Sequence, residues 1–342
     1  MSLKNLSVKI KIPKLLKDKL NNKRIEKIYK KFEGSLKINE NFAVAVSGGP
    51  DSLALAFLAK IFSIKKKLRG KFYIIDHKLR PESTREAKLV KNLLKKFLIN
   101  AEILTWRGKK PSKNVQSIAR TNRYKLLYAK CEKLKIKKIL LGHHQDDLLE
   151  NFFIRIVRGS GLKGLISLDK DNKVGNKNLL RPLLYQKKED LIFLAKNIFQ
   201  FYINDPSNKN EKFQRIRIRK LIKGLQDDGL NKIKFLKTIN NLKHSNNVVN
   251  FYVNENLQKN TSYSIGNDQL FLNREFFKQP YEVVFRALSE SIKLIGKKYY
   301  PVRGKKLDKV ISNLENNQSF RGTLGSCIIE KVNQTVIISK EH

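Results

Sequence analysis

The chain has 342 residues, of which 41% are hydrophobic and 30% charged, and its formal net charge is +42 at pH 7. That length allows two domains with a sizeable core, and the hydrophobic content excludes a largely disordered chain. No apolar stretch approaches the roughly 18 residues that a membrane-spanning helix needs. The basic N-terminus (MSLKNLSVKIKIPKLLKDKL) lacks the continuous apolar segment of a signal peptide, so a cytoplasmic location is expected.

The positive charge allows two interpretations. Lysine and arginine spread along the whole chain indicate a polyanionic partner, above all nucleic acid, because each phosphate that is neutralised releases counterions. Compositional bias is the alternative, since the chain is also rich in Asn and Ile. The two cysteines, Cys131 and Cys327, lie far apart and form no CxxC pair, so metal and redox functions lack support.

Residues 1–40 form a basic N-terminal segment, for which an amphipathic surface segment is one interpretation. From about residue 41 to 160, short apolar runs alternate with longer segments whose apolar residues recur every three or four positions. The runs are apolar at nearly every position, which is typical of strands buried on both faces of a parallel sheet. They are FAVAVS (42–47), KFYIIDH (71–77), AEILTW (101–106) and KKILLGHH (137–144). This alternation predicts an α/β fold: a parallel, Rossmann-like sheet with helices on both faces, and a ligand site outside the carboxyl ends of its strands.

Beyond residue 172 the pattern predicts a loop, a short extended piece, a helix, and then a strongly basic helix within 201–225. The sequence Asp227-Asp228-Gly229 interrupts the helical pattern and places a domain boundary near residue 226. We therefore expect a catalytic domain over 41–225 and a smaller α+β domain over 226–342. Two alternating apolar runs around Asn333 predict a β-hairpin close to the C-terminus.

The stretch SGGPDS (47–52) joins the first predicted strand to a helix. Consecutive glycines allow a close approach of the backbone to an anion, and the start of a helix offers free amides and a partial positive charge. Asp51 does not suit a simple anion site unless it holds a metal ion or takes part in chemistry. The lysine of the Walker P-loop and the Rossmann GxGxxG pattern are both absent. A plain glycine-rich turn with a capping side chain is the alternative.

SGGPDS resembles the signature of the N-type ATP pyrophosphatase, or PP-loop, superfamily, whose members cleave ATP between the α and β phosphates and adenylate a substrate. The superfamily includes NAD and GMP synthetases, tRNA thiolases and tRNA(Ile)-lysidine synthetases. The resemblance implies that the loop holds pyrophosphate and that Asp51 contacts Mg²⁺ or acts in catalysis. The ATP-binding residues that it implies in the loop are Ser47, Gly48, Gly49, Pro50, Asp51 and Ser52.

Two later motifs resemble the tRNA(Ile)-lysidine synthetases specifically. DHKLRPES (76–83) ends the second predicted strand and implies that Asp76 and His77 lie next to the nucleotide. GHHQDDLLE (142–150), followed by RGSGLKGL, carries Asp146, Asp147 and Glu150, of which the last two share a helix face. These acids suit Mg²⁺, here through Asp51 and Asp147, or the amine of lysine; acids that only cap a helix are the alternative.

Arginines complete the predicted site. Arg120 and Arg123 lie three apart on one predicted helix, where a solvated basic face is the alternative, and Arg158 begins the RGSG turn. Arg215 and Arg219 match the arginines of the family's RNxIR pattern, although Ile216 stands at the position of its Asn. We expect Arg215 to act in catalysis beside Asp51 and Asp147, because arginine neutralises charge that develops on phosphate. The other four arginines are expected to contact RNA or phosphate.

The resemblance covers roughly residues 40–225 and, more weakly, TLGSCIIE near the C-terminus. It implies a ligase that uses ATP, with Mg²⁺, to adenylate the wobble cytidine of tRNA(Ile) with a CAU anticodon and then attaches free L-lysine. The C-terminal region is expected to bind tRNA, and a homodimer is left open. A tRNA thiolase with the same first step and a non-catalytic RNA-binding protein are the two alternatives.

Overall fold

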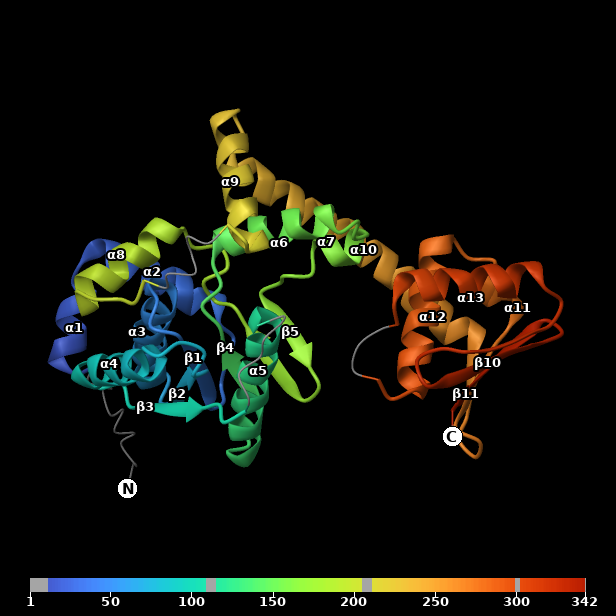
Figure 1. Cartoon of the computed structure of the whole chain (residues 1–342), viewed down its shortest axis with the longest axis horizontal. Coiled ribbons are helices and arrows are strands. Elements are labelled where there is room, and N and C mark those ends of the chain that lie inside the picture. The colour runs from blue at the N-terminus through green and yellow to red at the C-terminus, as the bar shows by residue number, and fades with distance from the viewer. Residues whose placement is uncertain (1–11, 109–114, 205–210, 299–301, 342) are drawn as a thin grey trace, which may run out of the picture. The chain divides into compact units, whose positions relative to one another are not determined.

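The computed structural model describes residues 12–108, 115–204, 211–298 and 302–341. The chain divides into two compact units, residues 1–231 and 232–342 (Figure 1).

The described residues of the first unit form a six-stranded sheet with the order β3-β2-β1-β4-β6-β5. Strands β1 to β4 and β6 pair in parallel, and β5 adds an antiparallel edge. Their bounds are β1 Phe42–Val46, β2 Gly70–Asp76, β3 Ala101–Thr105, β4 Lys138–Leu140, β5 Asp171–Val174 and β6 Lys177–Leu180. The prediction of a parallel sheet is confirmed. The edge hairpin β5–β6 occupies the stretch for which the sequence indicated a loop and an extended piece.

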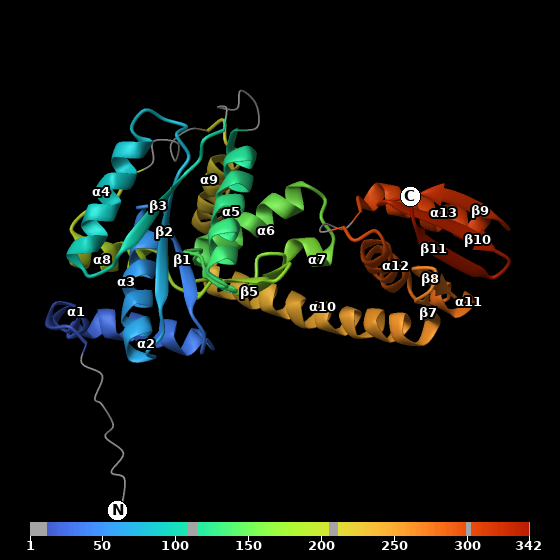
Figure 2. The same ribbon diagram turned by 90° about the horizontal axis from the view of Figure 1, so that it is seen from below.

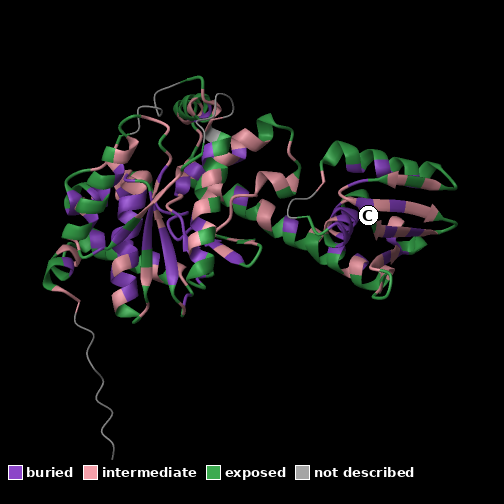
Figure 3. Cartoon of the chain, turned by 60° about the horizontal axis from the view of Figure 1, so that its bottom comes forward, coloured by how far each residue is buried: buried purple, intermediate pink, exposed green. Residues whose placement is uncertain are grey.

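Alternate residues of the strands serve two separate cores. Phe42, Val44 and Val46 face a large core that they share with helices α2 (Lys23–Ser35), α3 (Pro50–Lys65), α4 (Ser83–Lys96) and α8 (Lys188–Phe199). Ala43 faces the opposite side, where Leu127 and other residues of α5 (Val115–Lys133) cover the sheet. Figure 2 shows these layers, and Figure 3 shows that the strands between them are buried. The predicted helices on both faces are therefore confirmed.

The strand order places a topological switch between β1 and β4. The connections after β1 and β2 run toward β3 through α3 and α4, whereas the connection from β3 returns through α5 to β4 on the other side of β1. In open α/β sheets, ligands bind outside the carboxyl ends of the strands at such a point. The stretches SGGPDS and GHHQDD follow β1 and β4, so they flank the switch.

The N-terminal helices belong to this core. Helices α1 (Lys14–Leu20) and α2 bury Leu16, Ile25, Tyr29 and Phe32 at 1% exposure or less. Residues 14–35 are thus part of the first unit and do not form a basic segment separate from it, because their apolar faces pack against α3. Residues 1–11 lie outside the described part of the chain.

Three further helices complete the first unit: α6 (Gln145–Val157), the short α7 (Leu162–Leu165) and α9 (Gln214–Asp227). Helix α9 is the strongly basic helix that the sequence predicts, and it packs against α6. Among the described residues, no helix has the length and apolarity to cross a membrane.

The second unit combines helices with an antiparallel sheet of order β7-β8-β11-β10-β9. Its core gathers around the apolar face of α12, with Leu288 and Ile292 fully buried. The predicted hairpin is confirmed as β10 and β11, which turn at Asn333 with a φ of 53°. The bounds are α10 Lys232–Asn260, β7 Thr261–Ser264, β8 Gln269–Leu272, α11 Arg274–Phe277, α12 Tyr281–Ile295, α13 Gly304–Asn316, β9 Phe320–Thr323, β10 Cys327–Val332 and β11 Thr335–Lys340. This is the smaller α+β part expected from the sequence.

Candidate functional site

The loop after β1 is shaped by its own serine. The Ser52 hydroxyl accepts hydrogen bonds from the backbone N–H groups of Ser47 and Gly48, both at 3.1 Å, and donates to the carbonyl of Gly49 at 3.0 Å. Ser52 is 7% exposed. This hydroxyl holds the loop in shape, and its predicted contact with phosphate stays a prediction. Pro50 is the first residue of α3, where its missing N–H is not needed.

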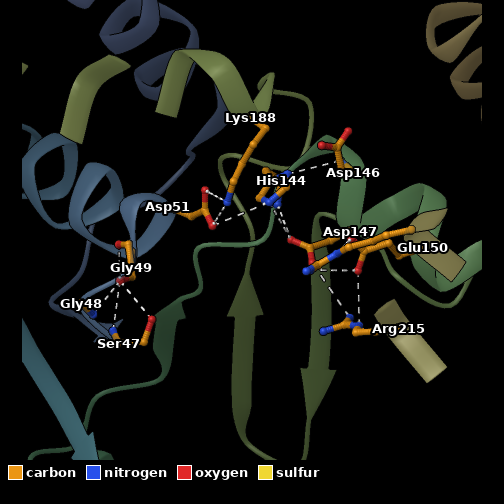
Figure 4. A network of polar contacts seen from close by, with 12 residues as sticks. Ser47, Gly48, Gly49, Asp51, His144, Asp146, Asp147, Glu150, Lys188 and Arg215 are labelled. Carbon is orange, nitrogen blue, oxygen red and sulfur yellow. Dashed lines mark hydrogen bonds and ion pairs between the residues drawn. The ribbon is translucent and has the colours of Figure 1, made fainter. Parts of the chain in front are cut away.

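Asp51, in the first turn of α3, forms an ion pair that the sequence analysis did not anticipate. Lys188 Nζ lies 2.7 Å from Oδ1 and 2.6 Å from Oδ2 of Asp51. On the other side, Nε2 of His144 is 3.7 Å from Asp51 Oδ2 (Figure 4). The side chains of Asp51 and Lys188 are 23% and 29% exposed, so a ligand can reach both.

His144 links the phosphate loop to the acids of α6. Its backbone N–H donates to Asp147 Oδ2 at 3.0 Å, and its Nδ1 accepts from the N–H of Asp146 at 3.2 Å, which together form a capping box. His144 Nε2 lies 3.6 Å from Asp147 Oδ2. Burial raises the pKa of Asp147, but His144, His143 and the hydrogen bond outweigh it and hold the pKa below its usual value.

Glu150 lies on the same side of α6 as Asp147 and is paired with arginines of α9. Arg219 Nε donates to Glu150 Oε1 at 2.6 Å, and Arg215 Nε is 3.5 Å from Oε2. Arg215 Nη2 is also 4.0 Å from Asp147 Oδ1. Glu150 is 2% exposed, and this burial raises its pKa despite the opposing effect of Arg219. Arg219 thus partners a buried carboxylate, and its expected contact with RNA or phosphate stays a prediction.

The residues after β2 form a second group. The carboxylate of Asp76 accepts hydrogen bonds from the Lys78 amide and from the hydroxyls of Ser83 and Thr84, at 2.7–3.0 Å. These contacts fix the β2–α4 loop through both oxygens of Asp76, and the predicted place of Asp76 beside the nucleotide stays a prediction. Arg123 Nε lies 3.5 Å from His77 Nε2. Burial and this arginine lower the pKa of His77 to about 4, so the imidazole is neutral at pH 7.

Two predicted arginines lie apart from these contacts. Arg120 stacks over Tyr124 on α5, with 5.2 Å between the guanidinium carbon and the ring centre. Arg158, at the end of α6, donates to Gln214 at the start of α9 at 3.0 Å. The structure therefore brings Asp51, Asp146, Asp147, Glu150, Arg215 and Arg219 together through His144, α6 and α9.

Sequence reasoning missed four residues, Lys188, His143, His144 and Arg181. Arg181 is buried and donates to the carbonyl of Asp169 at 2.6 Å and to the side chain of Asn172 at 2.9 Å. Burial lowers the pKa of His143 to about 3, and its buried Nδ1 has no hydrogen-bond partner among the residues that the structure describes. The two adjacent histidines in GHHQDD could have been recognised from the sequence as candidate site residues. Lys188 carried no such signal, because it is one of many lysines.

The described residues contain no group of three or more His, Cys, Asp or Glu arranged to hold a metal ion. Asp51 and Asp147 nevertheless each present a carboxylate oxygen within 4 Å of His144 Nε2. Magnesium is commonly bound by one or two carboxylates together with substrate phosphates and water. The donor set therefore fits an ion that arrives with a nucleotide better than a preformed cage.

Comparison with known proteins defines the class. The family model of the PP-loop domain matches residues 17–225. The U34-tRNA thiolase NcsA from Methanococcus maripaludis, solved with its [4Fe-4S] cluster, has the same fold, with a TM-score of 0.56 and 19% identity over 65% of this chain and 80% of that one. The fold, the switch point and the SGGPDS loop thus define an ATP-using PP-loop protein.

Curated relatives narrow the class to one family. The tRNA(Ile)-lysidine synthase of Orientia tsutsugamushi (strain Boryong) is 33% identical over 317 residues, covering 90% of this chain and 71% of the relative. That of Wolbachia sp. subsp. Brugia malayi (strain TRS) is 30% identical over 313 residues, covering 90% of this chain and 72% of the relative. The chain belongs to the tRNA(Ile)-lysidine synthase family.

Proposed function

We propose that the chain catalyses ATP-dependent formation of lysidine in tRNA(Ile), by joining free L-lysine to C2 of the wobble cytidine of the CAU anticodon. One observation carries the proposal. The phosphate loop after β1 and the carboxylates of α6 lie on either side of His144, at the switch point of the sheet (Figure 4). Such an arrangement suits a nucleotide phosphate and a cationic amine bound side by side.

The first step is adenylation. The O2 atom of cytidine attacks the α-phosphorus of ATP, the bond from that phosphorus to the bridging oxygen breaks, and pyrophosphate leaves with the electron pair. The loop supplies backbone N–H groups and the start of α3 for the leaving phosphates. Arg215, whose side chain is 43% exposed, supplies an accessible positive charge that can neutralise the phosphate.

The second step is attack by lysine. Its ε-amine bonds to C2 as the bond from C2 to O2 breaks, and AMP leaves with that oxygen. The amine must lose a proton before it attacks. The lowered pKa of Asp147 keeps this carboxylate ionised at pH 7, so it suits the binding of the incoming ammonium group. Asp146 and Glu150 are the neighbouring acids, which would help to bind the ammonium group and to accept its proton.

Magnesium belongs to the proposal as a companion of ATP. Asp51 and Asp147 would hold it, and the ion would offset the negative charge of the phosphates when bound.

The thiolase alternative is less well supported. A thiolase needs cysteines that carry sulfur or bind a cluster, and both cysteines of this chain are fully buried. Burial raises the pKa of each thiol to about 11, which suppresses the reactive thiolate. Cys131, a residue of α5, lies in the core between that helix and the sheet, and Cys327 lies in the core of the second unit.

The deciding experiment is incorporation of radiolabelled lysine into a tRNA(Ile) transcript with a CAU anticodon, in the presence of Mg²⁺ and ATP. We expect one AMP and one pyrophosphate to be released for each lysine that is incorporated. A transcript whose wobble cytidine is replaced by uridine should incorporate no lysine. Absence of lysine incorporation into the CAU transcript would overturn the proposal.

Asp51→Ala tests the catalytic part separately. Removing this carboxylate is expected to abolish turnover and to leave tRNA affinity nearly unchanged, because Asp51 belongs to the phosphate loop itself. Filter binding of labelled tRNA and the lysine assay measure the two quantities. A large loss of RNA affinity would contradict this role.

A further inference from the structure

The phosphate loop contains no positively charged side chain of its own. SGGPDS offers hydroxyls, amides and one carboxylate, whereas a Walker loop carries a lysine that reaches the phosphates. A polyphosphate approaching Asp51 and Asp147 meets negative charge, and such repulsion is strong where water is partly excluded. A cation is therefore needed close to Asp51 before the nucleotide arrives.

Lys188 meets that need from a position 137 residues further along the chain. Its ammonium group contacts both oxygens of Asp51 at 2.6 and 2.7 Å, and it keeps 29% of its side chain exposed. An ammonium donates in three directions, so contact with Asp51 leaves capacity for a phosphate oxygen. Figure 4 shows the side chain extending from α8 to the first turn of α3.

The backbone at Lys188 is fixed on two sides. Helix α8 buries Leu191, Leu194 and Ile198 in the core that it shares with α3, which carries Asp51. The turn before α8 is tied to the acid-bearing helix, because the N–H of Gln145 donates to the carbonyl of Gln186 at 3.2 Å. Lys188 is thus held between the nucleotide loop and the start of α6.

We propose that Lys188 is a further catalytic residue, which takes the place of the Walker lysine by moving from Asp51 onto the phosphates of bound ATP and stabilising the departing pyrophosphate. This inference rests on the proposed adenylation step. In the free protein Lys188 neutralises Asp51. In the reaction it offsets the charge that passes to the bridging oxygen as the bond to the α-phosphorus breaks.

The test compares full-length variants in pyrophosphate release with MgATP and the CAU transcript. Lys188→Met is expected to lower kcat about 100-fold, which is the usual effect of removing one preorganised contact to a developing charge. Lys188→Arg is expected to retain most of the activity because it keeps the charge. Lys187→Met is the matched control, since Lys187 is the adjacent lysine and is exposed. Its kcat should stay within twofold of the wild type, taking about twofold as the effect of an ordinary surface change.

Two further measurements separate catalysis from structure. Melting temperatures of Lys188→Met and Lys187→Met should agree, and tRNA affinity should be unchanged in both. Wild-type kcat in Lys188→Met would overturn the proposal. Equal loss of activity in Lys188→Met and Lys188→Arg, together with a lower melting temperature, would also overturn it, because the ion pair would then be only a structural brace.

The role of Lys188 and the proposed function can be tested separately. If the wild type releases pyrophosphate with tRNA but incorporates no lysine, the proposed function fails and the comparison of kcat still decides the role of Lys188. If the wild type releases no pyrophosphate, binding of N-methylanthraniloyl-ATP with Mg²⁺ decides it. Weaker binding by Lys188→Met than by Lys187→Met supports the role, and equal binding overturns it.

Discussion

Gly48 is the residue at which the loop tolerates no side chain. Its φ is +86°, and a Cβ atom there would lie 2.6 Å from Val90 Cγ2 and 2.9 Å from Ile203 Cδ1. Gly48→Ala should therefore lower the free energy of unfolding by about 1–3 kcal/mol and reduce ATP-dependent activity. Gly49→Ala is the control, because Gly49 has a φ of −74° and its Cβ would meet only Ser47 Oγ at 3.9 Å. Urea denaturation measures the free energy of unfolding of the two variants. Equal values for Gly48→Ala and Gly49→Ala would contradict the prediction.

Asp76 gives a pH-dependent prediction at the same scale. Burial raises its pKa, but the hydrogen bonds from Thr84, Lys78 and Ser83 outweigh burial and lower the pKa below 3.8. A carboxylate with a lowered folded-state pKa stabilises the protein above its unfolded pKa, and this contribution is lost as pH falls through the folded value. Asp76→Asn should thus cost about 2 kcal/mol at pH 7, and the difference from wild type should shrink below pH 3.8. Denaturation at several pH values checks this. A difference that is independent of pH would contradict it.

At the scale of elements, the contact between α6 and α9 depends on one buried carboxylate. Glu150 is 2% exposed, and Arg219 is its nearest partner. Arg219→Ala should destabilise the packing of α9 by about 1–3 kcal/mol, because a buried acid then loses its strongest hydrogen bond. Arg217→Ala should change little, since Arg217 is exposed and donates to the backbone carbonyls of Glu211 and Lys212. Hydrogen exchange of the α9 amides distinguishes the two variants. Equal exchange rates would contradict the assignment.

The elements of the first unit were largely predictable because their apolar patterns are local. The runs at 42–47, 71–77 and 101–106 became β1, β2 and β3 with small changes at their ends. The β5–β6 hairpin was less predictable, since its strands DNKV and KNLL lack an apolar run. It joins the sheet because β6 pairs with β4 and β5 then pairs with β6. The packing of α2 into the core was missed because a lysine-rich sequence obscures its apolar face.

The candidate site was predictable where residues are close in sequence. Asp147 and Glu150 share a helix face by their spacing alone. The partners of these acids were not predictable, because Arg219 and Lys188 reach them through tertiary packing across 69 and 137 residues. Spacing also cannot show whether a polar group is already occupied. The hydrogen bonds that Ser52 and Asp76 form within their own loops are an example that the sequence alone did not predict.

For the whole molecule, each unit has a core of its own, and the excess of lysine and arginine extends over both. Charge of this kind does not determine a fold, but it does govern association with polyanions. The residues around His144 and the overall charge therefore contribute separately to function. The former suit the reaction, and the excess of lysine and arginine suits the binding of tRNA.

A net charge of +42 leads to a quantitative expectation for that binding. If the basic residues contact tRNA phosphates, each contact releases counterions, and affinity should fall about 1,000-fold or more between about 50 and 200 mM salt. Filter binding with tRNA(Ile) across this range measures the slope. A tRNA(Met) transcript should give a similar slope, because phosphate contacts do not depend on sequence. Binding of N-methylanthraniloyl-ATP with Mg²⁺ should change far less, since it involves few phosphates. A flat profile for tRNA would show that the charge is compositional bias and would leave recognition to the site residues alone.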